Sequence, residues 1–249
     1  MATEKEVQDA LNFVDENDSL QGFEDLTTDT MAIPFVRLLQ TLSPQVDEDS
    51  SDYIEGAKPG MFFNTVTNEL YGKEIEVVVI KFEHIYIEWK PERGGLVGYH
   101  SPEHAEEIAA DKTFGNWKTA SGNQLQENFV YYVLIAGHEQ EGVMILSMSS
   151  SALKEARKWN RRMRNHVMPN GKKALPYYLV WKLTSEKRSN DKGSWYGFDI
   201  DLSGYVTKEL YLSAKEEQNL LPGKTVDYAQ IADAREESQP AESDEDVDF

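Results

Sequence analysis

The sequence predicts a mainly β protein with added helices, whose strands curl into a small barrel. β-Branched and aromatic residues fill the stretch 75–89, which predicts a long strand, bent or strongly twisted. Two pairs of shorter apolar stretches follow, 129–136 with 143–148 and 177–184 with 194–202. A polar segment that contains glycine separates the members of each pair, so each pair predicts a hairpin.

A basic helix is expected between the third and fourth of these five strands. It covers the segment from Ser150 to Pro169, where Ser149, Ser150 or Ser151 can cap the first turn and the proline ends the helix. Its apolar residues recur at steps of three and four, the spacing of one helix face, and are Ala152, Ala156, Trp159, Met163 and Val167. A helix at this place among five strands is typical of an OB-fold, so we expect an OB-fold-like barrel.

The remaining segments complete the expected order of elements. The apolar stretch 31–42 predicts a helix after Pro34 that packs on the body. Further expectations are a mobile acidic segment over 1–30 with a short helix near 7–14, a strand at 61–64, a helix at 102–110, a polar loop at 116–126 and a closing helix at 207–220.

The charge of the chain lies at its two ends. The 249 residues carry a net charge of −19 and include no cysteine. Residues 1–55 contain 14 Asp and Glu against two Lys and Arg, and residues 232–249 contain eight against one. The segment between them is therefore neutral, and an acidic chain can still hold a nucleic-acid site there. The lack of cysteine, of a signal peptide and of a long apolar run predicts a cytoplasmic protein without a membrane span.

The basic helix supplies the candidate phosphate contacts. Six cations lie within it and two follow it, namely Lys154, Arg157, Lys158, Arg161, Arg162, Arg164, Lys172 and Lys173. A solvated surface helix is the ordinary explanation of such a run. The alternative is a surface that binds phosphates.

Aromatic residues supply the candidate base contacts. Successive strand residues point to opposite faces, so Tyr178 and Lys182 share the face away from the predicted core, as does Trp195 in the next strand. Tyr86 and Trp89 are further aromatics with a His or Lys neighbour. An exposed ring beside a cation can stack on a base while the cation neutralises its phosphate. Packing in the core is the alternative for each of them.

No motif in the chain supports an enzyme, a cofactor or a metal site. Gly223-Lys224-Thr225 lacks the preceding glycine of a phosphate-binding loop. His100 and His104 are four residues apart, but Pro102 between them interrupts a common helix face. Asp199 and Asp201 share one strand face and leave a nuclease as a third alternative.

Two features resemble phage single-stranded DNA-binding proteins. The last residues combine a run of acids with a terminal phenylalanine, as the tails of that class do, and Asp248 replaces the proline usual in bacterial members. These residues are Asp244, Glu245, Asp246, Asp248 and Phe249. The stretches 22–25, 32–45 and 56–64 are also similar to phage proteins of this class. The resemblance implies an OB-type core, no cofactor and binding without sequence preference.

We therefore predict sequence-independent single-stranded DNA binding in phage replication or recombination. The expected organisation is an acidic mobile segment over 1–30, an OB-fold-like DNA-binding domain over 31–231 and an acidic disordered tail over 232–249. The tail would compete with DNA and recruit a replication or recombination protein, and homo-oligomerisation stays open. The alternative function is an acidic DNA mimic that inhibits a host nucleic-acid-binding protein.

Overall fold

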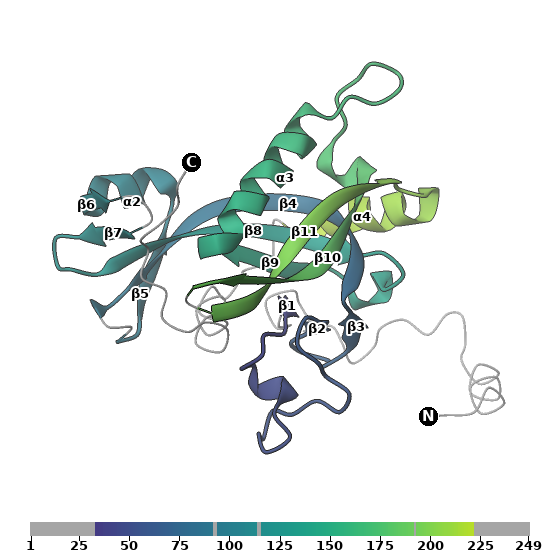
Figure 1. The fold of residues 1–249 in the computed structure, drawn as a ribbon. Helices are drawn as coiled ribbons and strands as arrows, with labels where there is room; N and C mark the ends of the chain where they lie inside the picture. Colours follow the sequence, from purple (N-terminus) through teal and green to yellow (C-terminus); the bar gives the residue numbers. More distant parts are fainter. Residues whose placement is uncertain (1–32, 92–93, 114–115, 192, 222–249) are drawn as a thin grey trace, which may run out of the picture.

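The computed structural model describes residues 33–91, 94–113, 116–191 and 193–221. Strands dominate this part of the chain, in an eight-stranded and a three-stranded sheet, and three α-helices accompany them (Figure 1). The eight-stranded sheet consists of β4 (Glu74–Trp89), β5 (Leu96–His100), β6 (Ala109–Thr113), β7 (Asn116–Thr119), β8 (Gln124–Ile135), β9 (Met144–Ser149), β10 (Leu179–Asn190) and β11 (Gly193–Tyr205). The segments 1–30 and 232–249, predicted to be mobile or disordered, lie outside the described residues.

The large sheet curls around one helix. Its strands follow the order β11-β10-β4-β8-β7-β6, while β5 pairs with β4 and β9 pairs with β8. The two end strands of this path are not paired with each other, so the described sheet curls as a half-barrel (Figure 1). The prediction was a mainly β fold with added helices and an OB-fold-like barrel, and it is confirmed by the strand content, the half-barrel curl of the sheet and the three helices.

A bulge divides β4 into two halves. The pairing of β4 with β8 shifts by one residue between Val79 and Lys81. Side chains alternate between the two sides of the sheet along a strand. After the extra residue, the even-numbered side chains therefore point to the side that the odd-numbered ones occupied before it. Val77 and Val79 face one side of the sheet before the bulge, and Phe82 and the alternate residues after it face the same side.

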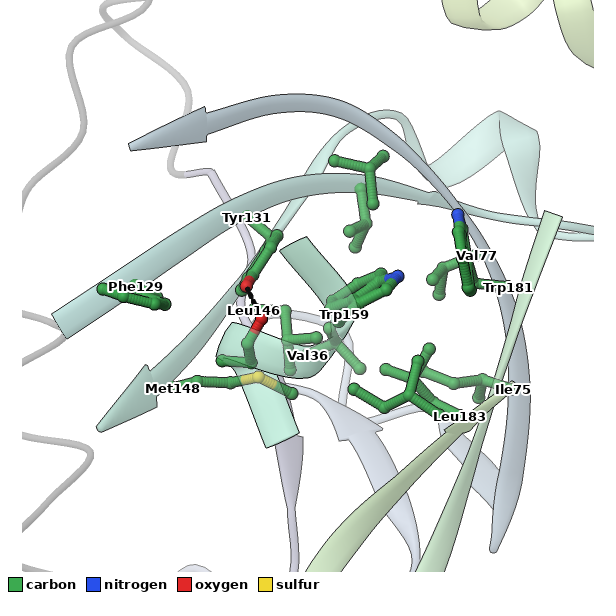
Figure 2. Packing of buried hydrophobic residues seen from close by; sticks show 14 of the residues in the cluster. Val36, Ile75, Val77, Phe129, Tyr131, Leu146, Met148, Trp159, Trp181 and Leu183 are labelled. Carbon is green, nitrogen blue, oxygen red and sulfur yellow. Dashed lines mark hydrogen bonds between the residues drawn. The ribbon is translucent and has the colours of Figure 1, made fainter. Parts of the chain in front are cut away.

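The helix α3 (Leu153–Asn165) covers that side of the sheet and anchors there through Trp159. The indole is 1% exposed and stacks on Tyr131 of β8, with 4.4 Å between ring centroids. It also meets the Trp181 ring of β10 edge-on at 6.1 Å (Figure 2). The Tyr131 hydroxyl donates a hydrogen bond to Asn160 Oδ1 at 2.9 Å, and burial raises the pKa of this phenol. The apolar stripe of the predicted basic helix is therefore the core contact of α3.

The ends of α3 differ from the prediction. A short 3₁₀ turn, Ser150–Ala152, precedes the helix, and no serine side chain caps either element. Residues 150 and 151 are part of this turn, so they cannot serve as the residue that caps α3. The helix ends at Asn165, four residues before Pro169, and Val167 is consequently exposed.

The helix α4 (Lys208–Leu220) packs on the opposite side of the sheet, as the predicted closing helix. The Thr207 hydroxyl caps it by accepting a hydrogen bond from the backbone N–H of Leu210. Leu210 and Ala214 are buried against Val78 and Val180 of the sheet. The predicted helix at 102–110 is also present, as α2 (Pro102–Ile108) with Ser101 as its cap. Among the described helices, none is both long and apolar enough to cross a membrane.

The helix predicted after Pro34 is wrong, because this segment contains the strand β1 (Val36–Leu38). β1 pairs with β2 (Phe62–Asn64), and β2 pairs with β3 (Leu70–Gly72), which gives the small sheet. The segment does pack on the body, where Phe35 bridges to Ile145 of β9. The apolar run is buried on both sides, and such a run has no periodicity that separates helix from strand.

The loop predicted at 116–126 is also wrong, because β7 and the start of β8 form a hairpin there. Similarly, the polar segment 185–192 is mostly strand. β10 and β11 remain paired up to Asn190 and Gly193, with a two-residue link between them. Both corrections concern polar strands. Backbone hydrogen bonds to an antiparallel partner stabilise such strands, so their sequence need not alternate between apolar and polar residues.

Candidate nucleic-acid interface

One ridge of α3 presents four cations to solvent. Lys154, Arg157, Arg161 and Arg164 recur at steps of three and four, which places them along one side of the helix. All four are exposed, while the residues on the opposite side pack into the core. We call these four residues the cation ridge. Over this ten-residue separation the helix rises by about 15 Å, at about 1.5 Å per residue.

Three of the ridge cations have no acidic partner within the described part of the chain. Lys154, Arg161 and Arg164 form no ion pair or side-chain hydrogen bond to another described residue. In contrast, Arg157 Nη2 lies 2.5 Å from Glu127 Oε2 on β8. The three unpaired charges are thus available to an anionic ligand without first breaking a contact.

The other two cations of α3 form ion pairs with carboxylates of the protein. Lys158 Nζ is 2.9 Å from Glu155 Oε1, and Arg162 pairs with Asp201 of β11 at 3.2 Å. Arg162 also donates a hydrogen bond to the carbonyl of Ile200 and lies over the Trp181 ring. Arg162 therefore fastens α3 to β11, and Asp201 serves as its counter-ion.

A small hairpin extends beyond the helix and carries the two lysines. The Met168 N–H donates to the Lys172 carbonyl at 2.8 Å, and the Ala174 N–H donates to the His166 carbonyl at 3.1 Å. The turn contains Gly171 at φ +78°, a left-handed conformation that glycine adopts without strain. We call residues 166–174 the finger, which projects past the end of α3 (Figure 1). It carries Lys172 and Lys173, which are both exposed.

Five rings form a continuous row on the α3 side of the sheet. This aromatic row consists of Phe82, Phe129, His84, Tyr86 and Trp117. The Phe129 ring lies edge-on to both Phe82, at 5.4 Å, and His84, at 4.9 Å. His84 continues to Tyr86 at 5.5 Å, and Tyr86 stacks on Trp117 at 5.1 Å. The bulge in β4 brings Phe82, His84 and Tyr86 to this face.

The aromatic row meets the cation ridge at Arg157. The Arg157 guanidinium lies 5.4 Å from the centroid of the Phe129 ring while it pairs with Glu127. Burial alone would raise the pKa of the Glu127 carboxyl, but the neighbouring His84 and Arg157 lower it below the usual value. At the far end of the row, α2 packs on Tyr86 through Ala105. Phe82 is 39% exposed and the His84 side chain is 32% exposed, so these two rings remain accessible to solvent.

Two predicted base-stacking residues are buried, so that prediction is wrong for them. Tyr86 is 8% exposed, and burial raises its pKa to about 12. Trp89 is 7% exposed, and its Nε1 donates a hydrogen bond to Gln126 Oε1 at 3.2 Å. Trp117 and Ala105 of α2 cover the Tyr86 ring, and Trp89 packs in the core cluster on the other side of the sheet.

Tyr178 and Lys182 do not join the α3 surface. The Tyr178 ring contacts Tyr177 at 5.1 Å and Tyr211 of α4 at 5.7 Å, on the other side of the sheet. Lys182 Nζ lies 2.6 Å from Glu74 Oε1, and a hydrogen bond with that carboxylate raises the pKa of the lysine. The predicted pairing of a free cation with a stacking ring is wrong here, because Glu74 already neutralises the lysine.

Trp195 lies in β11, opposite Arg188 of β10. It is partly buried and faces Arg188 across the β10–β11 hairpin. Arg188 Nη1 in turn lies 3.8 Å from Glu155 Oε1 of the helix. Trp195 thus stays a candidate stacking residue beside Arg188.

Four members of the aromatic row, His84 among them, were not among the predicted contacts. Phe82, Phe129 and Trp117 come from three strands, and Lys112 Nζ lies 5.5 Å from the Trp117 ring centroid. The alternation of Phe82, His84 and Tyr86 is visible in the sequence. The faces of Val79 and Phe82 cannot be related from that alternation, because the bulge lies between them.

Comparison with known proteins gives one match. No curated protein matches the chain, and no solved structure matches it. A family model described as Pam3 phage gp34-like protein matches residues 3–227. That match covers most of the 249 residues and includes α3, the finger and the whole aromatic row. The chain belongs to the Pam3 phage gp34-like protein family.

Proposed function

We propose that this protein binds single-stranded DNA without sequence preference, in phage replication or recombination in the host cytoplasm. The observation that carries the proposal is the junction at Arg157, where the cation ridge meets the open end of the aromatic row. Phosphates lie along the ridge and finger and release counter-ions, while bases stack on Phe82 and its neighbours. Every base has a π-face, so this arrangement does not distinguish sequences.

The second candidate is an acidic DNA mimic that occupies a nucleic-acid site of a host protein. The net charge of −19 favours it. The unpaired cations of α3 count against it, because an acidic mimic would present them to a basic partner at an electrostatic cost. The two functions predict opposite ligands, so one binding assay separates them.

Fluorescence anisotropy with labelled oligo-dT, and with a duplex of equal length, tests the proposal. We expect saturable binding to oligo-dT, weaker binding to the duplex, and a log affinity that falls linearly with log salt. The tryptophan emission of the protein is expected to change on binding, since Trp117 belongs to the aromatic row. Absence of oligo-dT binding at low salt would reject the proposal and leave the mimic.

Single replacements of the stacking candidates give a first prediction. Phe82→Ala is expected to weaken oligo-dT binding by about 1–3 kcal/mol, the usual contribution of one stacked base, and Trp195→Ala by a similar amount. Phe82→Leu controls for packing, because it keeps apolar contact with Tyr131 but offers no aromatic face. Tyr99→Ala is the matched control, since this exposed ring on β5 pairs with Ile87 on the other side of the sheet. Equal binding by all four variants would remove the aromatics from the interface.

The acidic tail gives a second prediction. Residues 233–249 contain eight Asp and Glu against one Arg, and a tethered polyanion competes with DNA at a high effective concentration. Deletion of these residues is expected to tighten oligo-dT binding, most clearly at low salt, where charges are least screened. Deletion of Phe249 alone leaves the side-chain charge unchanged, so it should spare DNA affinity and weaken only recruitment of a replication protein. Equal DNA affinity of the full and truncated chains at low salt would contradict competition by the tail.

A further inference from the structure

The turn between β8 and β9 gathers chemistry that DNA binding does not use. It runs from Gly137 to Gly142, and both glycines have positive φ, +85° and +70°. These left-handed residues let the chain close around the short 3₁₀ helix Glu139–Glu141. As a result, His138 and Glu141 lie three residues apart and point the same way, with His138 Nδ1 only 3.0 Å from Glu141 Oε1.

A third ligand atom comes from the small sheet. Glu69 precedes β3, and its Oε1 lies 3.3 Å from His138 Nδ1. The three ligand atoms, one imidazole nitrogen and two carboxylate oxygens, lie within 4.8 Å of one another. Ligands about 2.0–2.1 Å from one tetrahedral Zn²⁺ are separated by about 3.3 Å, so the two distances to His138 match a shared metal ion.

The surrounding residues hold Glu141 in place. Its Oε2 accepts hydrogen bonds from the Tyr71 hydroxyl and from Asn64 Nδ2, each at 2.7 Å. Asn64 is 1% exposed, and its Oδ1 accepts from the backbone N–H of Val66, which fixes the orientation of the amide. With Oε2 occupied, the free Oε1 is directed at His138. Such second-shell donors orient the ligands of protein metal sites.

We propose that Glu69, His138 and Glu141 bind one first-row divalent cation of the Zn²⁺ type. An imidazole with two carboxylates favours Zn²⁺ over Mg²⁺ and Ca²⁺, which prefer oxygen ligands. The fourth position is left to water. The ion would join β3 to the β8–β9 turn and so tie the small sheet to the large one. None of these residues belongs to the cation ridge, the finger or the aromatic row, so this site and DNA binding succeed or fail separately.

Isothermal titration of the chelator-treated full chain with Zn²⁺ tests the site. We expect one ion per chain, and a melting temperature raised by about 5–10 °C at a hundredfold excess over Kd. His138→Gln and Glu69→Gln should abolish both effects. Tyr71→Phe, which removes only the donor to Glu141, should weaken Zn²⁺ binding by about 10–100-fold. Mg²⁺ at the same concentration should raise the melting temperature little.

His104→Gln is the matched control. His104 Nδ1 also lies near a glutamate, 3.4 Å from Glu107, but in an exposed pair outside the proposed site, so this variant should bind Zn²⁺ like the wild type. The visible spectrum of the Co²⁺-substituted protein reports coordination directly and should lose its bands in His138→Gln. Equal Zn²⁺ affinity in wild type and His138→Gln, or no saturable binding, would overturn the proposal. In that case the His138 N–H simply hydrogen-bonds the two glutamates.

Discussion

Replacing Lys154, Arg161 and Arg164 together by alanine is expected to weaken oligo-dT binding on the order of 100-fold at 50 mM salt. Each phosphate contact contributes about 0.7 to the slope of log affinity against log salt for single strands, so the slope should become shallower by about 2. These three residues are the ridge cations without an acidic partner among the described residues, and their side chains are exposed. Their loss therefore removes contacts to DNA and no internal ion pair.

The matched control removes the same charge elsewhere. Lys58, Lys208 and Lys215 are also exposed, and the last two belong to α4 on the opposite side of the sheet. Their triple alanine variant should keep the wild-type slope and lose affinity only through the general change in net charge. If both triple variants lose affinity and slope equally, the α3 ridge is not the phosphate surface and binding depends on overall charge alone.

Trp159→Ala is expected to lower the free energy of unfolding by about 3–5 kcal/mol, the usual cost of removing a buried large aromatic. The indole is 1% exposed and contacts both Tyr131 and Trp181, so its loss leaves a cavity between α3 and the sheet. For a domain of this size, the melting temperature should fall by roughly 10 °C. Denaturant unfolding followed by circular dichroism measures the change.

Two variants on the same helix sharpen that test. Trp159→Phe should cost less than alanine, because it keeps an aromatic contact with Tyr131 and removes an indole N–H that has no hydrogen-bond partner in the described structure. Arg161→Ala, on the exposed ridge, should change stability by less than about 0.5 kcal/mol. A Trp159→Ala variant as stable as Arg161→Ala would show that α3 is not anchored through its apolar stripe.

The sequence predicted the long-range order of the fold best where its local patterns were strong. The spacing of Ala156, Trp159 and Met163 identified both the helix and its buried face. Each hairpin was predicted from two apolar runs with a glycine-containing segment between them. β1 could not be predicted, because its strand state depends on pairing with β2, more than twenty residues away. The run 35–39, apolar except at Arg37, has no periodicity that separates the two states.

The candidate site was predicted only in part for a related reason. The cations were visible as a helical pattern, but their partners were not. Arg162 and Lys182 meet the carboxylates of Asp201 and Glu74, which lie on other strands. Likewise, Tyr86 appeared as an aromatic beside a histidine, whereas Trp117 and α2 bury it. Exposure and charge pairing depend on tertiary contacts that no local pattern contains.

The bulge in β4 reverses which residues of this strand face α3. Upstream of Ile80 the odd-numbered residues face α3, and downstream the even-numbered ones do. If β4 kept all its residues but ran without the bulge, its odd-numbered residues would continue to face α3, and Lys81, Glu83 and Ile85 would replace Phe82, His84 and Tyr86 on that side. Deleting Ile80, the extra residue, would instead remove the bulge and leave these three rings facing α3. In this strand, the spacing between residues specifies the binding surface as much as their identity does.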